Sequence, residues 1–204
     1  MDKAKVISWG YDKPRDEGFQ CVEWFKLLLL NDEDLPTHLR DSAHIQEART
    51  MLVKLTKDAT LATADYLKEL WKHATKAIEK DKGPSLVKSA SFHVILTVPA
   101  IYKHYGRERM RRAAELAGIL DERPQCNNTT LSFVTEPESA VIASLPELHY
   151  RGDLIAGDSF VVCDCGGGTV DIISYTVVQT QPLVIRECVE GDGMLFSSPF
   201  SPIH

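Results

Sequence analysis

The stretch that decides the fold is Cys163-Asp164-Cys165-Gly166-Gly167-Gly168-Thr169-Val170-Asp171. It separates two runs rich in β-branched and aromatic residues, 160–163 and 172–178, and each run has the composition of a strand. The pattern therefore predicts a hairpin with a glycine tip. A hairpin turn needs only two residues, and extra glycines cost backbone entropy on folding. Three in a row therefore favour a close approach of some other group to the main chain.

Two interpretations of the glycine tip stay open from the residues themselves. In the first, the tip is an ordinary glycine-rich β-turn. In the second, it binds a phosphate: consecutive amides form a nest around the phosphate oxygens, and the flanking carboxylates hold a hydrated divalent cation. The phosphate ligands would be the amides of Gly166, Gly167, Gly168 and Thr169, and the cation ligands Asp164 and Asp171.

The surrounding sequence resembles the ATPase domain of the 70-kDa heat-shock chaperones, which are relatives of actin and the sugar kinases. Asp-x-Gly-Gly-Gly-Thr-x-Asp, starting at Asp164, is similar to the second phosphate loop of that family. Ile-Leu-Thr-Val-Pro-Ala at 95–100, with a helix closing at Ala-Gly-Ile at 117–119, resembles the family's strand, turn and helix end. Glu-Pro-Glu-Ser-Ala at 136–140 resembles its Glu-Pro-x-x-Ala element. The three elements follow one another in the family's order.

Two shorter segments resemble a divergent branch of the same family, whose members often lack the usual peptide-binding half. They are Trp9-Gly10-Tyr11 and Ala64-Asp65-Tyr66-Leu67.

The resemblance implies a role for each candidate site residue. Asp164 would hold magnesium through water, the amides of residues 166–169 would bind the phosphates of ATP, and Asp171 would support the same network. Glu136 would help to position the metal or the attacking water, which suits phosphoryl transfer because its transition state is stabilised by amides, metal and an orienting carboxylate. Glu136 also has a structural interpretation, as an anionic residue that the dipole of a helix start stabilises by up to about 1 kcal/mol.

The periodicity of the chain predicts an α/β fold with helices flanking a mixed sheet, and the resemblance makes this a partial actin-like (ribonuclease H-like) ATPase fold. An apolar helical segment is expected at 22–30. One apolar stripe is expected to run along a helical region from about residue 35 to 80, and it comprises Leu52, Leu55, Ala59, Ala62, Tyr66, Leu70, Ala74 and Ala77.

Further along the chain, strands and helices alternate. A strand covered on both faces is expected at 92–98, helices at about 102–117 and 137–145, and strands at 131–134, 160–164, 171–179 and 183–189. The arginines between 107 and 112 are expected on a solvated helix face, and the resemblance offers Arg107 as a relay of nucleotide state. We expect a partial first lobe with a long helical segment at 1–90, and at 91–204 an ATPase core that carries the second phosphate loop and is truncated at its C-terminal end.

Composition excludes several classes of partner. With 204 residues, 44% hydrophobic and 25% charged, the chain resembles an ordinary globular protein. A net charge of −6 gives no basic surface for nucleic acid or anionic membrane, and neither a membrane-spanning run nor a signal peptide is visible. A cytoplasmic location is expected. Five scattered cysteines are expected as buried thiols rather than disulfides or metal ligands.

Other parts of such an ATPase have no match. The family's first phosphate loop is a glycine-threonine hairpin, whereas Gly10 and Gly18 are the only glycines before residue 80, and the catalytic lysine cannot be assigned. We therefore expect an ATP- and magnesium-binding module that is poorly active alone, with nucleotide and possible protein clients or co-chaperones as partners. The alternatives are a non-enzymatic interaction protein or pseudo-ATPase that retains the fold and, less favoured, a sugar or acetate kinase relative.

Overall fold

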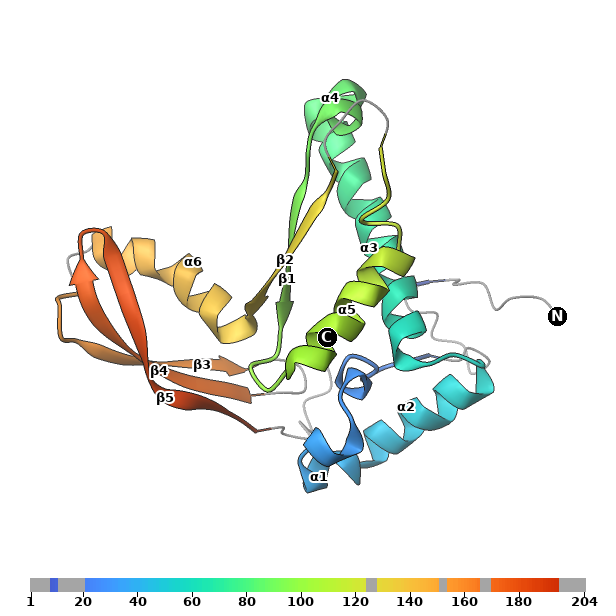
Figure 1. Ribbon diagram of the computed structural model, residues 1–204, viewed down its shortest axis with the longest axis horizontal. Helices are drawn as coiled ribbons and strands as arrows, with labels where there is room; N and C mark the ends of the chain where they lie inside the picture. Colours follow the sequence, from blue (N-terminus) through green and yellow to red (C-terminus); the bar gives the residue numbers. More distant parts are fainter. Residues whose placement is uncertain (1–7, 11–20, 124–127, 151–153, 166–169, 195–204) are drawn as a thin grey trace, which may run out of the picture. The chain divides into compact units, whose positions relative to one another are not determined.

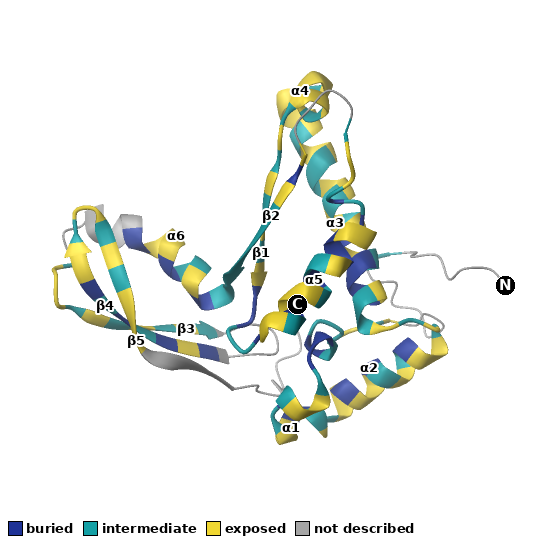
Figure 2. Ribbon diagram, viewed as in Figure 1, coloured by how far each residue is buried: buried dark blue, intermediate teal, exposed yellow. Residues whose placement is uncertain are grey.

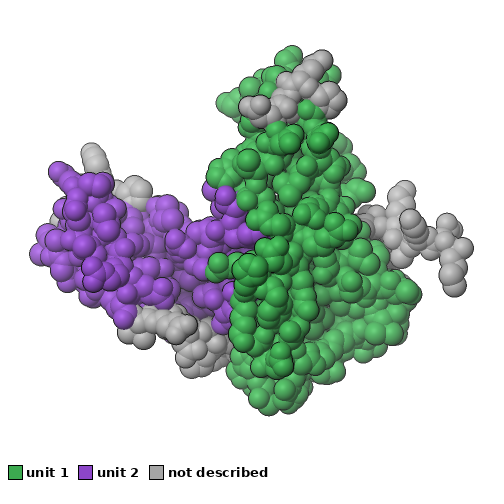
Figure 3. Space-filling view, viewed as in Figure 1, with its two compact units in different colours: residues 1–94, 103–131 green, residues 95–102, 132–204 purple. Residues whose placement is uncertain are grey.

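The computed structural model describes residues 8–10, 21–123, 128–150, 154–165 and 170–194. The chain forms two compact units, each built from separate stretches of sequence and coloured separately in Figure 3. The first unit comprises Met1–Val94 and Lys103–Leu131, and the second comprises Ile95–Tyr102 and Ser132–His204. No helix in the described part of the chain is long and apolar enough to cross a membrane.

The first unit is mainly helical. Its elements are two short 3-10 turns, η1 (Leu27–Leu29) and η2 (Asp32–Asp34), followed by α1 (Thr37–Arg40), α2 (Ala43–Lys54), α3 (Ala59–Lys82), α4 (Pro84–Ser89) and α5 (His104–Leu116) (Figure 1). Helix α3 packs against α4, α5 and η1, and α5 also packs against η1. The largest buried side chains of this unit come from these elements and include Leu27, Leu29, Ile45, Leu52, Leu67 and Met110.

Local signals set the helix ends. The side chain of Ser42 accepts a hydrogen bond from the Ile45 N–H at 3.3 Å and begins α2, and Asp58 does the same for α3 through the Leu61 N–H at 2.7 Å. Helix α3 ends at Gly83 and α5 ends just before Gly118, and both glycines have positive φ. Glycine is suited to these positions because it lacks a Cβ.

The prediction of one continuous apolar stripe along the helical region 35–80 is wrong between α2 and α3. The chain leaves the helix after Lys54 and starts again at Ala59, with Thr56 in the left-handed region at φ +54°. On α3, Leu67 is buried, whereas Tyr66 and Leu70, which belong to the predicted stripe, are each 38% exposed. The apolar segment expected at 22–30 is also not an α-helix, because only the short turn η1 forms there.

The second unit contains an antiparallel sheet of three strands, β3 (Ser159–Cys165), β4 (Val170–Thr180) and β5 (Leu183–Met194), in that order. The predicted hairpin pairing of the first two strands is confirmed. Helix α6 (Glu136–Tyr150) covers one face of the sheet. The core between helix and sheet contains Val141, Leu145, Ile173 and Tyr175, flanked by Leu154, Phe160, Val162, Leu183 and Ile185.

The described side chains on the other face of this sheet are more exposed, and we call it the open face. Residues of β4 alternate between buried and more exposed, as Figure 2 shows, and Val161 on β3 is 66% exposed. A row of polar side chains crosses the open face: Thr176 Oγ1 lies 2.9 Å from Ser159 Oγ and 2.8 Å from Cys188 Sγ. Cys21, Cys163 and Cys188 are exposed, so the prediction of buried thiols is wrong for all three. The strand alternation puts Cys163 and Cys188 on the solvent side of the sheet.

The strands β1 (His93–Val98) and β2 (Thr130–Thr135) form a separate, two-stranded parallel sheet, and the boundary between the two units falls within both. The α/β class is confirmed, but the described strands form two sheets rather than one mixed sheet. Ile95 is 58% exposed, which also corrects the expectation that both faces of this strand are covered.

Candidate functional site

The two predicted metal-binding carboxylates face each other. Asp164 and Asp171 are direct partners in the β3–β4 register, next to the last pair, Cys165 and Val170. Residues directly opposite each other in an antiparallel pair project to the same face of a sheet. The predicted phosphate ligands, Gly166 to Thr169, lie between these strands but outside the described residues.

Strand alternation assigns the aspartate pair to the face that α6 covers. Asp164 shares its side with Val162, and Asp171 shares its side with Ile173, and both apolar residues contribute to the core beneath α6. Asp171 is 2% exposed with its Oδ2 atom buried, whereas Asp164 is half-buried. A buried carboxylate is costly unless it is compensated by hydrogen bonds or positive charge.

The third predicted carboxylate, Glu136, is the first residue of α6 and directly follows β2. Its helix start is well built: Thr135 Oγ1 accepts from the Glu138 N–H at 3.3 Å, and Ser139 Oγ donates to the Glu136 carbonyl at 2.7 Å. Figure 1 shows the first turn of α6 at the end of the sheet where β3 finishes and β4 begins. The three predicted carboxylates therefore come from three elements that end or begin at the same side of the second unit.

The negative charges of acidic residues on α6 contribute to raising the pKa of two buried tyrosines. Burial, and then the charge of Glu136, raises the pKa of Tyr102, which is 4% exposed. Burial, and then the charges of Glu138 and Glu187, raises the pKa of Tyr175.

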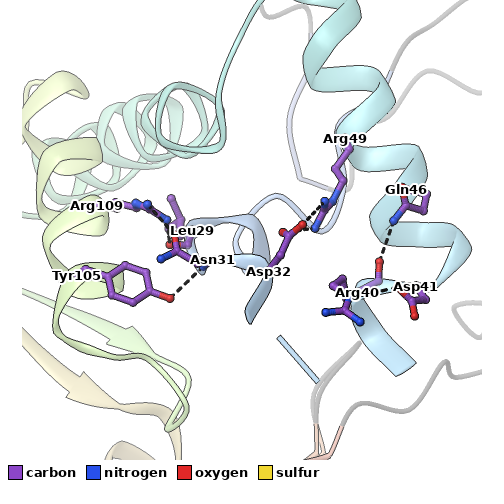
Figure 4. Close-up of polar contacts among 9 residues, drawn as sticks. All are labelled: Leu29, Asn31, Asp32, Arg40, Asp41, Gln46, Arg49, Tyr105 and Arg109. Atoms are coloured by element: carbon purple, nitrogen blue, oxygen red, sulfur yellow. Dashed lines mark hydrogen bonds and ion pairs between the residues drawn. The ribbon is translucent and has the colours of Figure 1, made fainter. Parts of the chain in front are cut away.

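A second polar cluster lies in the first unit, shown in Figure 4. Arg109 on α5 donates to the Leu29 carbonyl and to Asn31 Oδ1, both at 2.9 Å. Tyr105 accepts from the Asn31 N–H at 2.9 Å and donates to Asp34. The predicted solvated face is therefore wrong for Arg109, because its guanidinium binds the loop that joins η1 to η2.

Arg49 on α2 holds the same segment from another side, with a bidentate pair to Asp32 at 2.9 Å and 2.5 Å. The hydrogen bond from Arg49 lowers the pKa of Asp32. The terminal guanidinium nitrogens of Arg49 and Arg109 all bind acceptors within the protein, so the cluster accounts for how η1 and η2 are held.

The two segments that resemble the divergent branch of the family, 9–11 and 64–67, are in contact in the structure. The Trp9 ring packs edge-on against Tyr66, with ring centroids 6.0 Å apart, and against His73 at 5.6 Å. Trp71, which is half-buried, packs edge-on against Phe92, with ring centroids 5.3 Å apart.

In the described part of the chain, no three or more His, Cys, Asp or Glu side chains are grouped so that they could hold a metal ion directly. The aspartate pair alone supplies two carboxylates. Two carboxylates fit a magnesium ion that keeps most of its water ligands, since such ions are usually bound through one or two carboxylates.

The chain is similar to known heat-shock and chaperone proteins. The chain is 28% identical to human heat shock 70 kDa protein 12B over 243 residues, covering 95% of the chain and 32% of the relative. It is 31% identical over 142 residues to the chaperone protein HscA homolog of Neisseria meningitidis serogroup B, covering 70% of the chain and 19% of the relative. The HscA homolog of Acinetobacter baumannii is 29% identical over 93 residues, 46% of the chain and 13% of the relative. No family model matches the chain.

The chain spans about a third of the human relative's length and about a fifth of the Neisseria relative's. The human alignment of 243 residues is longer than the chain of 204, so that relative carries residues with no counterpart here. The homology implies an actin-like fold. The ordered motifs and these matches over most of its residues show that the chain is a distant homologue of the 70-kDa heat-shock proteins.

Proposed function

We propose that the chain binds ATP with magnesium at the end of the β3–β4 hairpin. The observation that carries this proposal is the opposed pair of Asp164 and Asp171, on the face covered by α6 and on either side of the glycine segment. The family to which the chain is related binds ATP with magnesium. Whether the chain also hydrolyses ATP is a separate question, because the chain matches only part of each relative.

Electrostatics supports a cation at the aspartate pair. Like charges directly opposite each other in a sheet destabilise it, and burial of Asp171 increases the repulsion because the local dielectric is low. A hydrated magnesium ion, when bound, would neutralise both carboxylates and the phosphate oxygens.

Different groups of the chain would bind the phosphates, hold the metal-bound water and orient the carboxylates. The amides of Gly166 to Thr169 would bind phosphate oxygens, Asp164 would hold metal-bound water, and Asp171 would fix the orientation of that network. Glu136, at the same end of the unit, would orient the metal's water shell or the attacking water. Protein clients or co-chaperones are proposed as further partners from the names of the HscA relatives, which are chaperones.

The direct test is ATP affinity of the whole chain, measured by calorimetry with magnesium and with EDTA. Gly167→Val places a branched side chain where the phosphate would approach and should weaken MgATP binding more than tenfold. Ala156→Val, at an exposed turn of the same unit, is the matched control and should bind like the wild type. If the Gly167→Val variant binds MgATP as tightly as the wild type and has an unchanged circular dichroism spectrum, the glycine segment is only a turn and does not bind phosphate.

A second variant addresses the metal. Asp164→Asn should lower the preference for ATP with magnesium over ATP with EDTA, whereas Asp41→Asn, an exposed acid of the first unit, should leave it unchanged. If the wild-type chain binds ATP equally with and without magnesium, the aspartate pair is not a metal site.

A further inference from the structure

Three residues lie directly opposite one another across the antiparallel sheet, at the end that carries the glycine segment. Asp171 on β4 pairs with Asp164 on β3 and, on its other side, with Gly193 on β5. Residues directly opposite one another project to the same face of a sheet, so a side chain at position 193 would lie beside the buried Asp171, on the face that α6 covers. Because glycine has no side chain, this row holds two carboxylates and no third side chain.

The irregularity of β5 does not account for a glycine at position 193. The β4–β5 register shifts between Ile172 and Ser174, and Gly191 lies in the part of β5 opposite that shift, where a bulge commonly places a glycine. Beyond the shift the pairing is regular over 192–194, which includes Gly193. A glycine inside a regular strand weakens it, and it often marks a place where a ligand approaches closely. Gly193 is therefore better explained by a need for space than by backbone geometry.

We propose that Gly193 is a specificity-determining residue, whose lack of a side chain makes room beside Asp171 for the water shell of a magnesium ion. The inference rests on the proposed function, in which the aspartate pair holds hydrated magnesium. A magnesium ion bound through one or two carboxylates keeps several of its water ligands, so it needs more space than a bare cation. A side chain at position 193 would occupy that space. It would therefore weaken the binding of the metal rather than the binding of the nucleotide itself.

Gly193→Val in the whole chain tests the inference, because it should change folding and binding in opposite directions. Valine favours strands and glycine weakens them, so the variant without ligand should melt at the wild-type temperature or above it. Its affinity for MgATP, measured by calorimetry, should nonetheless fall more than about tenfold, as expected when a branched side chain is forced into filled space. Its affinity for ATP in EDTA should stay within about twofold of the wild type. Gly193→Ala adds a single methyl group and should lower MgATP affinity less.

Ser174→Val is the matched control. Ser174 lies on β4 opposite Val161, so it belongs to the open face of the same sheet, away from the aspartate pair. The substitution introduces the same side chain into a strand without narrowing the space beside Asp171. It should leave the affinity for MgATP within about twofold of the wild type.

Three results would overturn the role of Gly193. If Gly193→Val lowers the melting temperature without ligand, the glycine serves the fold. If the variant binds MgATP like the wild type, position 193 is not beside the metal, and if it loses affinity equally with and without magnesium, the space belongs to the nucleotide. A wild-type chain that binds no MgATP would overturn the proposed function as well. Binding that Asp164→Asn weakens and Gly193→Val does not would overturn this inference alone.

Discussion

Asp34 accepts hydrogen bonds from two side chains at the start of α5, Lys103 and Tyr105. The hydrogen bond from Lys103, and then that from Tyr105, lowers the pKa of Asp34 below its usual range. A carboxyl group whose pKa is lower in the folded state stabilises the protein above its ordinary pKa. That stabilisation is lost as the pH falls through the folded-state value.

Replacing Asp34 with Asn removes this charge and should lower the melting temperature by a few degrees at pH 7. The difference from the wild type should shrink below about pH 4, because the wild-type carboxyl is then increasingly neutral as well. Asp81→Asn removes an acid that is 70% exposed and should have little effect at either pH. Melting curves from pH 3 to pH 7 provide the measurement, and a gap of constant size would show that Asp34 acts through its shape rather than its charge.

Among single residues, short-range pairs were predictable and long-range ones were not. The facing of Asp164 and Asp171 follows from a hairpin, since the two residues are separated only by the turn and one strand pair. Arg109 binds partners 78 and 80 positions away, and nothing near Arg109 in the sequence marks them. A charge run on a helix predicts solvent exposure until the loop that covers it is known.

At the scale of elements, hydrophobic periodicity located the helices but missed a break. The spacing Leu52, Leu55, Ala59 continues a helical stripe through the turn between α2 and α3, so the pattern alone could not reveal the interruption. The available signal was Asp58, a good N-cap residue. Strand alternation was more informative, because it gave both the β3–β4 pairing and the side on which each aspartate lies.

The end of α2 offers a test of local backbone strain. The Thr56 N–H donates to the Val53 carbonyl and the Lys57 N–H to the Leu52 carbonyl, both at 3.0 Å, which is the hydrogen-bond pattern of a helix that ends on a left-handed residue. Thr56 holds that position at φ +54°, where a β-branched residue is strained.

Thr56→Gly should therefore stabilise the chain, by about 1 kcal/mol after allowance for the greater flexibility of glycine in the unfolded state. Thr50→Gly makes the same exchange inside α2 and should destabilise it, because glycine is a poor helix former. Both threonines are exposed, so packing contributes little to either result. Urea denaturation measures the free energy of unfolding of the two variants. If both substitutions lower it, Thr56 is not strained.

For the whole molecule, the number of sheets was the least predictable feature. Each strand could be recognised from its own residues, but which strands pair depends on contacts between distant segments. The described strands separate into the β1–β2 sheet and the β3–β4–β5 sheet. The family resemblance predicted the actin-like fold but not the division of the strands into two sheets. Motifs mark the residues of a site, whereas strand order depends on contacts that motifs do not encode.

The open face of the antiparallel sheet should influence solubility. Val161, Ile172, Val178 and Val184 are each more than 40% exposed, and exposed β-branched residues on a sheet promote association. Val161→Thr should reduce concentration-dependent association in sedimentation velocity and leave the melting temperature nearly unchanged. Val162→Thr, one residue along and facing the core, should instead lower the melting temperature. Unchanged association of the Val161→Thr variant would show that this face is not the cause.

The alternation of β3 separates two neighbouring residues chemically. Cys163 has an exposed thiol on the open face, and Asp164 belongs to the face beneath α6. A maleimide fluorophore attached to Cys163 would therefore sit one residue from the candidate site and on the opposite side of the sheet from it. In a variant with the other thiols replaced by serine, such a label could serve as an optical reporter of ligand binding without blocking the ligand's approach.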